Sequence, residues 1–82
     1  MANRPKLSLH DLRRILRSFG VSEDTSAGKG SHTKFFKQFP EGCFSYPVPK
    51  DREVKDCYVR GSRKKFRLTP EHGVSDDVFY GR

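Results

Sequence analysis

The sequence predicts a small α+β domain in which one helix precedes an antiparallel sheet and a second helix follows it. Apolar residues recur at helical spacing near the N-terminus and again after residue 53, and between these segments apolar and polar residues alternate as in strands. With 82 residues the chain is expected to form a single domain, 1–82, that buries about 60–65% of the surface of its unfolded form. We expect residues 1–6 to be flexible and residues 69–82 to form a C-terminal tail with a short helical turn.

The first helix is predicted to begin after Ser8. Serine is a favoured N-cap residue, and Asp11 stands three residues later, where it completes a capping box with Asp in place of the usual Glu. The apolar side chains that follow form one stripe on the predicted helix. They are Leu9, Leu12, Ile15, Leu16 and Phe19. Gly20 is expected to end the helix, because glycine readily adopts the left-handed conformation found there.

The first strand of the sheet is predicted to be short, and the second is predicted from a clear alternation. Residues 21–30 are polar and contain glycine, which predicts a loop with a short edge strand near Thr25–Lys29. From Ser31 the side chains alternate between two faces. One face carries Thr33, Phe35 and Lys37, and the other carries His32, Lys34, Phe36 and Gln38.

A further strand is predicted over residues 43–48, where Phe44, Tyr46 and Val48 alternate with other residues. The preceding Pro40-Glu41-Gly42 is typical of a turn, so the two strands are expected to form an antiparallel hairpin. Prolines at positions 47 and 49 have no backbone N–H to donate, so this strand is expected to lie at an edge of the sheet or to end there.

The second helix is predicted over residues 54–68. The residues on its apolar face are Val54, Tyr58, Val59, Ser62 and Phe66. Gly61 lies inside this helix, where glycine costs about 1 kcal/mol relative to alanine, so we expect it to allow close packing against the sheet. The segment is also the most basic part of the chain. Its cations are Arg60, Arg63, Lys64, Lys65 and Arg67.

The charge of the chain favours a polyanionic partner. It has 17 Lys and Arg residues against 10 Asp and Glu residues, a formal net charge of +7. Cations that neutralise phosphates release counterions, which drives the binding of nucleic acids. A basic protein without such a partner is the alternative. No apolar stretch is long enough to span a membrane and no signal peptide is recognisable, so we expect a cytoplasmic protein without a membrane partner.

Neither a metal site nor a cofactor site is predicted. Cys43 and Cys57 do not have the spacing of a C-x-x-C or Cys/His ligand set, so they are expected to be reduced and partly buried. The acidic residues are scattered. The close pair Asp76–Asp77 is more typical of the first turn of a short helix than of a Mg²⁺ site.

The segment Gly28-Lys29-Gly30-Ser31 is a candidate phosphate-binding stretch. Glycine permits positive φ angles, with which consecutive N–H groups can converge on an anion, and Lys29 and Lys34 would add positive charge. The spacing differs from that of the G-x-x-x-x-G-K-[ST] loop that binds nucleoside triphosphates. A plain flexible loop is the alternative interpretation.

His32 is the candidate for proton transfer. Histidine can accept or donate a proton near neutral pH, and a positioned one typically accelerates a reaction about 10²–10⁴-fold. RNA cleavage requires a base for the 2′-hydroxyl, cations that stabilise the phosphorane and an acid for the departing oxygen. A structural histidine is the alternative. Lys34, Tyr46 or a water molecule are candidates for the second proton-transfer group, whereas His10 and His72 are expected to be bystanders.

The motifs and their order resemble the HicA-type mRNA interferases, the toxins of HicAB toxin–antitoxin systems. The likeness extends over nearly the whole chain, from about residue 7 to residue 80. It consists of a first helix ending in Phe19-Gly20-Val21, the motif Gly30-Ser31-His32-x-x-Phe35, a strand ending in Pro47-Val48-Pro49 and a last helix beginning near Val54-Lys55-Asp56. Thr33 stands where many of these relatives carry a second histidine.

This resemblance implies an αβββα domain similar to the double-stranded RNA-binding fold, with a three-stranded antiparallel sheet and two helices on one face. It also implies a ribosome-independent endoribonuclease that cleaves mRNA, with His32 as the catalytic residue and a HicB-type antitoxin protein as partner. Together with the residues discussed above, it predicts metal-independent general acid/base catalysis. The predicted RNA and phosphate contacts are Gly28, Lys29, Gly30, Ser31 and Lys34, with Arg60, Arg63, Lys64 and Lys65 guiding the strand.

Two other interpretations remain open. A non-catalytic RNA-binding module would use the same sheet and basic helix, since small folds of this kind bind double-stranded RNA by its shape and phosphates. An interaction protein would instead use the basic surface for an acidic partner chain. For a toxin, the second property would accompany the ribonuclease activity, because an inhibitor that covers the basic surface also blocks the substrate.

Overall fold

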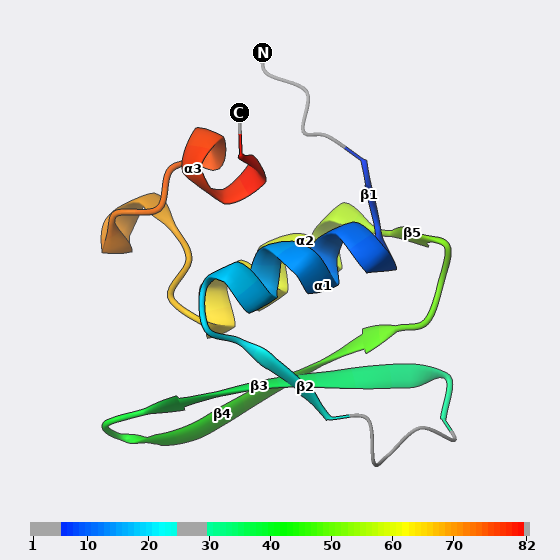
Figure 1. Ribbon diagram of the computed structural model, residues 1–82, viewed down its shortest axis with the longest axis horizontal. Helices are drawn as coiled ribbons and strands as arrows, with labels where there is room; N and C mark the ends of the chain where they lie inside the picture. The colour runs from blue at the N-terminus through cyan, green and yellow to red at the C-terminus, as the bar shows by residue number, and fades with distance from the viewer. Residues whose placement is uncertain (1–5, 25–29, 82) are drawn as a thin grey trace.

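The computed structural model describes residues 6–24 and 30–81, which form a three-stranded antiparallel sheet with the helices on one of its faces (Figure 1). The predicted α+β class is therefore confirmed. The elements in chain order are β1 (Leu7–Ser8), α1 (Leu9–Ser18), β2 (Ser22–Asp24), β3 (His32–Phe39), β4 (Gly42–Pro49), β5 (Glu53–Val54), α2 (Asp56–Lys65), the 3-10 helix η1 (Pro70–His72) and α3 (Asp76–Tyr80). Within these described ranges, no helix has the length and apolar character needed to cross a membrane.

Helix α1 begins where the capping pattern predicts. The Ser8 hydroxyl oxygen accepts a hydrogen bond from the Asp11 N–H at 3.0 Å, and the Asp11 carboxylate accepts one from the Ser8 N–H at 3.3 Å. The predicted apolar stripe faces the core, and its buried members are Leu12, Ile15 and Leu16. After the helix, Gly20 has a φ of 82°, the left-handed conformation expected there.

The sheet has the strand order β2-β3-β4, and both pairs are antiparallel. β3 and β4 form the predicted hairpin, which pairs from His32 opposite Pro49 to Phe39 opposite Gly42. β4 lies at an edge, as its prolines predict. The edge strand predicted near Thr25–Lys29 falls outside the described residues, and the strand that pairs with β3 on this side is β2, at residues 22–24.

The two faces of β3 differ as the alternation predicts. Thr33 and Phe35 are buried on the face that the helices cover. On the same face, the ammonium of Lys37 donates a hydrogen bond to the carbonyl oxygen of Phe19 at 2.9 Å, beyond the end of α1. His32, Lys34 and Gln38 are exposed on the other face, which no helix covers in Figure 1. We call this the open face of the sheet.

Helix α2 packs closely against β4 through Gly61. A Cβ atom at this position would lie 2.0 Å from the hydroxyl oxygen of Tyr46 and 2.6 Å from its ring carbon Cζ. Any side chain at residue 61 would therefore require the tyrosine to move. This contact confirms the prediction that the helix contains a glycine because it approaches the sheet closely.

Helix α2 is shorter than predicted at both ends. Val54 belongs to β5 and pairs with Leu7 of β1, and Lys55 has the extended backbone of an N-cap, with φ −62° and ψ 144°. At the other end, Arg67 has a φ of 60°, a left-handed conformation that cannot continue a helix. Periodicity could not predict the first difference, because β1 and β5 have 2 residues each.

The core lies between the helices and the covered face of the sheet. Its largest fully buried apolar side chains are Phe35, Phe66, Phe79, Leu12, Leu16 and Val48. Helix α3 occupies the position of the helical turn predicted in the tail, and its Phe79 stacks on Phe19 with ring centroids 6.0 Å apart. The tail therefore contributes to the core. Residues 1–5 of the predicted flexible N-terminus lie outside the described ranges.

The prediction that the cysteines are partly buried is wrong. Cys43 and Cys57 are both free and exposed. Cys43 pairs with Gln38 and so belongs to the open face of the sheet, where no helix covers it. Cys57 lies in the first turn of α2, outside the set of residues that this helix buries.

Candidate nucleic-acid interface

His32 is the first residue of β3, and its side chain is exposed on the open face of the sheet. Its Nδ1 lies 3.0 Å from the hydroxyl oxygen of Ser31. If the hydroxyl donates to Nδ1, then Nε2 carries the proton of the neutral ring, and if Nδ1–H donates to the hydroxyl, then Nε2 is the base. In both tautomers the serine contact leaves Nε2 for proton exchange with a substrate.

The backbone immediately before His32 is held by the end of the neighbouring strand. The carbonyl oxygen of Ser31 accepts a hydrogen bond from the N–H of Lys50 at 2.8 Å. This hydrogen bond holds the backbone of Ser31, whose hydroxyl contacts the His32 imidazole. Gly30 is exposed beside it, whereas Gly28 and Lys29, two of the predicted phosphate contacts, lie outside the described residues.

Lys34 stands two residues after His32 and is exposed on the same open face. The two residues are roughly 7 Å apart along the strand, from the usual rise per residue. Lys34 and Phe36 line a cavity of about 330 Å³ on this face, and the other lining residues are Asp24, Cys43 and Ser45. The structure therefore brings together a histidine and a cation that were predicted to act on the same phosphate.

Tyr46 is not placed to assist His32. It lies opposite Phe35 on the face that the helices cover, with its hydroxyl beside Gly61. Burial, together with the nearby Cys57 and Tyr58, raises the pKa of the tyrosine. Of the two side chains predicted as second proton-transfer groups, Lys34 alone shares the open face with His32.

Among the exposed cations of α2, the two lysines lie far from His32. Arg60 forms an ion pair with Asp56 at 2.8 Å. Lys64 and Lys65 are in the last turn, where the ammonium of Lys65 lies 5.5 Å from the centroid of the Phe44 ring. Phe44 pairs with residue 37 of β3, five positions from His32, which places it roughly 16 Å away along the strand. These lysines and His32 thus belong to two separate surface regions.

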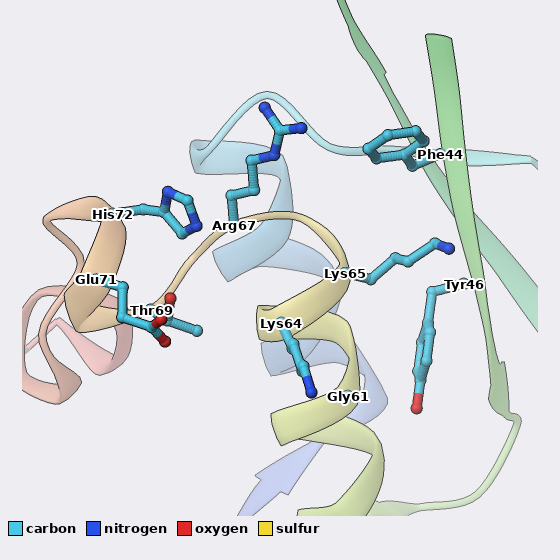
Figure 2. Close-up of a pocket in the computed structure, with 9 residues that line it drawn as sticks. All are labelled: Phe44, Tyr46, Gly61, Lys64, Lys65, Arg67, Thr69, Glu71 and His72. Atoms are coloured by element: carbon cyan, nitrogen blue, oxygen red, sulfur yellow. The ribbon is translucent and has the colours of Figure 1, made fainter. Parts of the chain in front are cut away.

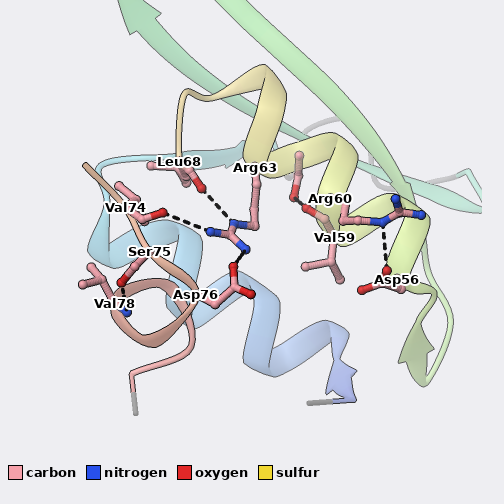
Figure 3. A network of polar contacts seen from close by, with 10 residues as sticks. Asp56, Val59, Arg60, Arg63, Leu68, Val74, Ser75, Asp76 and Val78 are labelled. Carbon is pink, nitrogen blue, oxygen red and sulfur yellow. Dashed lines mark hydrogen bonds and ion pairs between the residues drawn. The ribbon is translucent and has the colours of Figure 1, made fainter. Parts of the chain in front are cut away.

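Arg63 is buried, and the prediction that it guides RNA is wrong (Figure 3). Its Nε donates to the carbonyl oxygen of Leu68 at 2.8 Å, and its Nη2 donates to that of Val74 at 3.1 Å. Its Nη1 donates to the Asp76 carboxylate at 2.7 Å. The guanidinium also lies 4.5 Å from the centroid of the Phe79 ring. Arg63 therefore anchors the C-terminal tail to α2 and is not available to a phosphate.

Lys64 and Lys65 line a groove of about 610 Å³ between α2 and β4, shown in Figure 2. We call it the α2–β4 groove. Its aromatic lining comes from Phe44 and Tyr46, on the edge strand. Neither residue was among the predicted RNA and phosphate contacts, and Tyr46 was considered only as a proton-transfer group. The alternation of β4 nevertheless places both on the helix-facing side, next to the basic helix.

Two further residues of the groove follow α2 in the chain. Arg67 and His72 both line it, and neither was predicted to be a site residue. His72 was expected to be a bystander because it lies in the tail. The position of the tail depends on how the chain turns after the helix, which the sequence does not show. The basic run of the sequence extends to Arg67, and this run could have indicated that Arg67 belongs to the basic surface. The turn of the chain at Arg67 could not be predicted, because a left-handed residue other than glycine has no recognisable sequence pattern.

Arg67 connects the end of α2 to the turn of the hairpin. Its guanidinium carbon lies 4.6 Å from the centroid of the Phe39 ring, and Nη2 forms an ion pair with Glu41. The hydrogen bond from Arg67 holds the pKa of the Glu41 carboxyl below its usual range. A left-handed conformation costs a non-glycine residue roughly 1–2 kcal/mol. The contacts of Arg67 with Phe39 and Glu41 therefore accompany a backbone conformation that glycine would adopt without this cost.

Glu23 connects α1 to the sheet beneath the end of β3 that carries His32. Its carboxylate accepts a hydrogen bond from Nη2 of Arg13 at 3.1 Å and one from the hydroxyl of Thr33. The hydrogen bond from Arg13, with a further contribution from Thr33, lowers the pKa of Glu23. Thr33 is buried, so its contact with Glu23 is structural. In the HicA-type interferases that the sequence resembles, many members have a second histidine at this position.

Comparisons with other proteins do not assign the chain to a family. No protein-family model, curated protein or solved structure matches it. The resemblance to the HicA-type interferases therefore depends on the motifs and on the order of the elements. Among residues 6–24 and 30–81, no three His, Cys, Asp or Glu side chains are grouped so that they could hold a metal ion.

Proposed function

We propose that the protein is a metal-independent, ribosome-independent endoribonuclease, an mRNA interferase toxin of the HicA type, in which His32 transfers the proton. The observation that carries the proposal is the placement of His32, which is exposed at the start of β3, contacts Ser31 at 3.0 Å and shares the open face with Lys34. The order α1-β2-β3-β4-α2 agrees with the αβββα order of that family and of the double-stranded RNA-binding fold.

An RNA phosphate on the open face would contact His32 and Lys34 together. His32 accepts the proton of the 2′-hydroxyl, whose oxygen then attacks the adjacent phosphorus and displaces the 5′-oxygen of the next nucleotide. The ammonium of Lys34 stabilises the negative charge that develops on the phosphorane, and the backbone at Gly30 and Ser31 adds donors. The Lys34 ammonium or a water molecule donates a proton to the departing oxygen, and the protonated His32 then releases the proton it accepted to the solvent. The products carry a 2′,3′-cyclic phosphate and a 5′-hydroxyl.

The remaining exposed cations would bind the rest of the strand. Arg60, Lys64 and Lys65 can contact phosphates outside the cleaved bond, whereas the buried Arg63 is omitted from this set. A HicB-type antitoxin that binds these surfaces would block the substrate. In this proposal the protein acts on mRNA in the cytoplasm.

The test is cleavage of an end-labelled single-stranded RNA in excess EDTA by the wild type, His32→Ala and His10→Ala. We expect the loss of His32 to slow cleavage at least about 100-fold, the usual effect of removing a general acid or base. His10 is an exposed histidine of α1, so its variant controls for the loss of an imidazole and should cleave like the wild type. The product ends should be a cyclic phosphate and a 5′-hydroxyl.

Other results would contradict the proposal. Cleavage that persists in a folded His32→Ala protein would remove His32 from the reaction, and cleavage that EDTA abolishes would contradict a metal-independent mechanism. If neither the wild type nor the variant cleaves RNA but both bind it, the protein is a non-catalytic RNA-binding module.

A further inference from the structure

The α2–β4 groove combines cations with aromatic side chains, and the chemistry proposed at His32 does not use it. Lys64, Lys65 and Arg67 contribute positive charge, and Glu71 is the only carboxylate among the described residues that line the groove. Sites that hold single-stranded nucleic acid pair a positive groove for the backbone with aromatic rings on which bases stack. The groove has both features.

We propose that the α2–β4 groove is a second RNA-contact site, which binds a nucleotide distant from the cleaved bond. The base stacks on Phe44, and the neighbouring phosphates are held by Lys64, Lys65 and Arg67. This inference rests on the proposed function and adds to it the path of the RNA. The strand leaves the open face at His32, passes around the edge strand β4 and enters the groove on the other side of the sheet.

The cations and the ring are close enough for one nucleotide to contact both. The ammonium of Lys65 lies 5.5 Å from the centroid of the Phe44 ring, and the guanidinium carbon of Arg67 lies 5.7 Å from it. In Figure 2, Lys65 extends from α2 toward the two aromatic residues of β4. The Phe44 ring is only partly buried, so part of it remains available for stacking.

Arg67 supports a binding role, because its backbone conformation alone would favour glycine. Its φ of 60° suits glycine, and the arginine retains this conformation with its guanidinium at the groove and its orientation fixed by Glu41. A side chain kept at a conformational cost is a reason to look for function there. An acidic protein partner would use the cations alone, whereas RNA uses the cations and the ring, so we favour RNA.

The test measures binding in the full-length His32→Ala protein, so that the RNA stays intact. Fluorescence anisotropy with a fluorescein-labelled single-stranded RNA over a salt series gives affinity and salt dependence. We expect Phe44→Leu to weaken binding about fivefold or more, the effect of losing one stacked base. Alanine at both Lys64 and Lys65 should weaken binding and flatten the salt slope by about 0.7 for each phosphate that the protein no longer neutralises.

Two variants separate this site from general effects of charge and folding. Arg67→Gly should bind RNA more weakly while its melting temperature changes little, because the left-handed backbone that glycine favours offsets the lost contacts with Phe39 and Glu41. Lys55→Ala is the matched control for the lysines. Lys55 is exposed at the N-terminal end of α2, outside the groove, and its side chain makes no capping hydrogen bond, so this variant should bind nearly as its parent does.

Several outcomes would overturn the inference. If the groove variants bind RNA like their parent, the groove is not an RNA-contact site. If the lysine variants lose affinity but Phe44→Leu does not, the groove binds phosphates without stacking a base, and the inference of stacking is wrong. Unchanged RNA binding with lost binding of polyglutamate would identify a surface for an acidic protein. If the wild type does not cleave RNA but the groove variants lose affinity for it, the proposed function fails and the inference stands. The reverse result, cleavage without a groove effect, overturns only the inference.

Discussion

Glu23 links the stability of this domain to pH. Its side chain is 12% exposed, and the hydrogen bond from Arg13 lowers its pKa below the ordinary value of 4.5. A carboxyl group with a lower pKa in the folded chain stabilises the fold at pH values above its unfolded pKa, and this contribution is lost as the pH falls through the folded pKa. The contact between α1 and the sheet should therefore weaken in acid.

We expect Glu23→Gln to lower the free energy of unfolding by about 1 kcal/mol at neutral pH, because the charged acceptor is replaced by a neutral one. Below pH 4.5 the wild type progressively loses its advantage, so the two proteins should converge. Chemical denaturation across this pH range measures the difference. Glu71→Gln, at an exposed carboxylate of η1, is the control. If the difference in unfolding free energy between the wild type and Glu23→Gln stays constant as the pH falls, Glu23 does not link stability to pH.

Individual side chains were predictable where a local pattern determines them. The alternation of β3 predicts that His32 and Lys34 share one face, and the structure agrees. Arg63 was misassigned because arginines are usually exposed, and its neighbours in the run are cations. It lies four residues after Val59 and three before Phe66, so helical spacing places it on the core side. Its partners come from the tail, whose path the sequence does not reveal.

Among the elements, α3 depends most clearly on tertiary contacts. It has 5 residues, too few for a helix to be stable alone in water. Arg63 joins it to α2 through the Asp76 carboxylate and the Val74 carbonyl oxygen, and Phe79 inserts into the core. The tail should therefore separate from the domain if the buried arginine is removed.

We expect Arg63→Ala to lower the free energy of unfolding by about 2–3 kcal/mol, because buried carbonyl oxygens lose their donors. Amide hydrogen exchange over residues 74–80 should accelerate. Arg60→Ala provides the control on the same helix, since it removes an exposed ion pair with Asp56 and should cost less than about 1 kcal/mol. Equal effects of the two variants, or unchanged exchange in the tail, would show that Arg63 does not hold α3.

The predictability of the elements follows the range of the interactions that define them. Helix α1 and the β3–β4 hairpin have local signals, a capping box and a turn, and both were predicted close to their observed bounds. The pairing of β1 with β5 joins residues 7 and 54, which are distant in sequence, through two residues on each strand. Two residues are too few to show the alternation of a strand, so the prediction extended the helix over Val54.

On the scale of the whole molecule, the side chains proposed to contact RNA lie on two surfaces. His32 and Lys34 lie on the open face near one end of the hairpin, and Lys64, Lys65 and Arg67 lie near the other end on the covered side. Composition predicts a polyanionic partner but not this division. The division arises because side chains alternate across a strand and because α2 runs along β4, so its last turn lies beside the hairpin turn.

The arginines and lysines of the molecule also differ in what they contact. Arginines form the ion pairs Arg13–Glu23, Arg60–Asp56, Arg63–Asp76 and Arg67–Glu41, which join elements or stabilise a helix. Lys65 of the groove lies over an aromatic ring, as Arg63 and Arg67 also do, but it belongs to none of these ion pairs. A planar guanidinium suits fixed contacts with carboxylates, whereas the flexible lysine side chain can follow a mobile strand. The groove thus combines an arginine held by Glu41 with a lysine that none of these pairs includes.

Gly61 and Tyr46 share a single volume between α2 and β4, because a Cβ atom on the helix would come within 2.0 Å of the phenol oxygen. In any homologous chain with this helix–strand contact, a side chain at the first position would require the residue at the second to move or to be smaller. The two positions should thus covary during evolution. Their pairing, combined with Gly30-Ser31-His32, supplies a criterion for recognising distant relatives whose remaining residues have diverged.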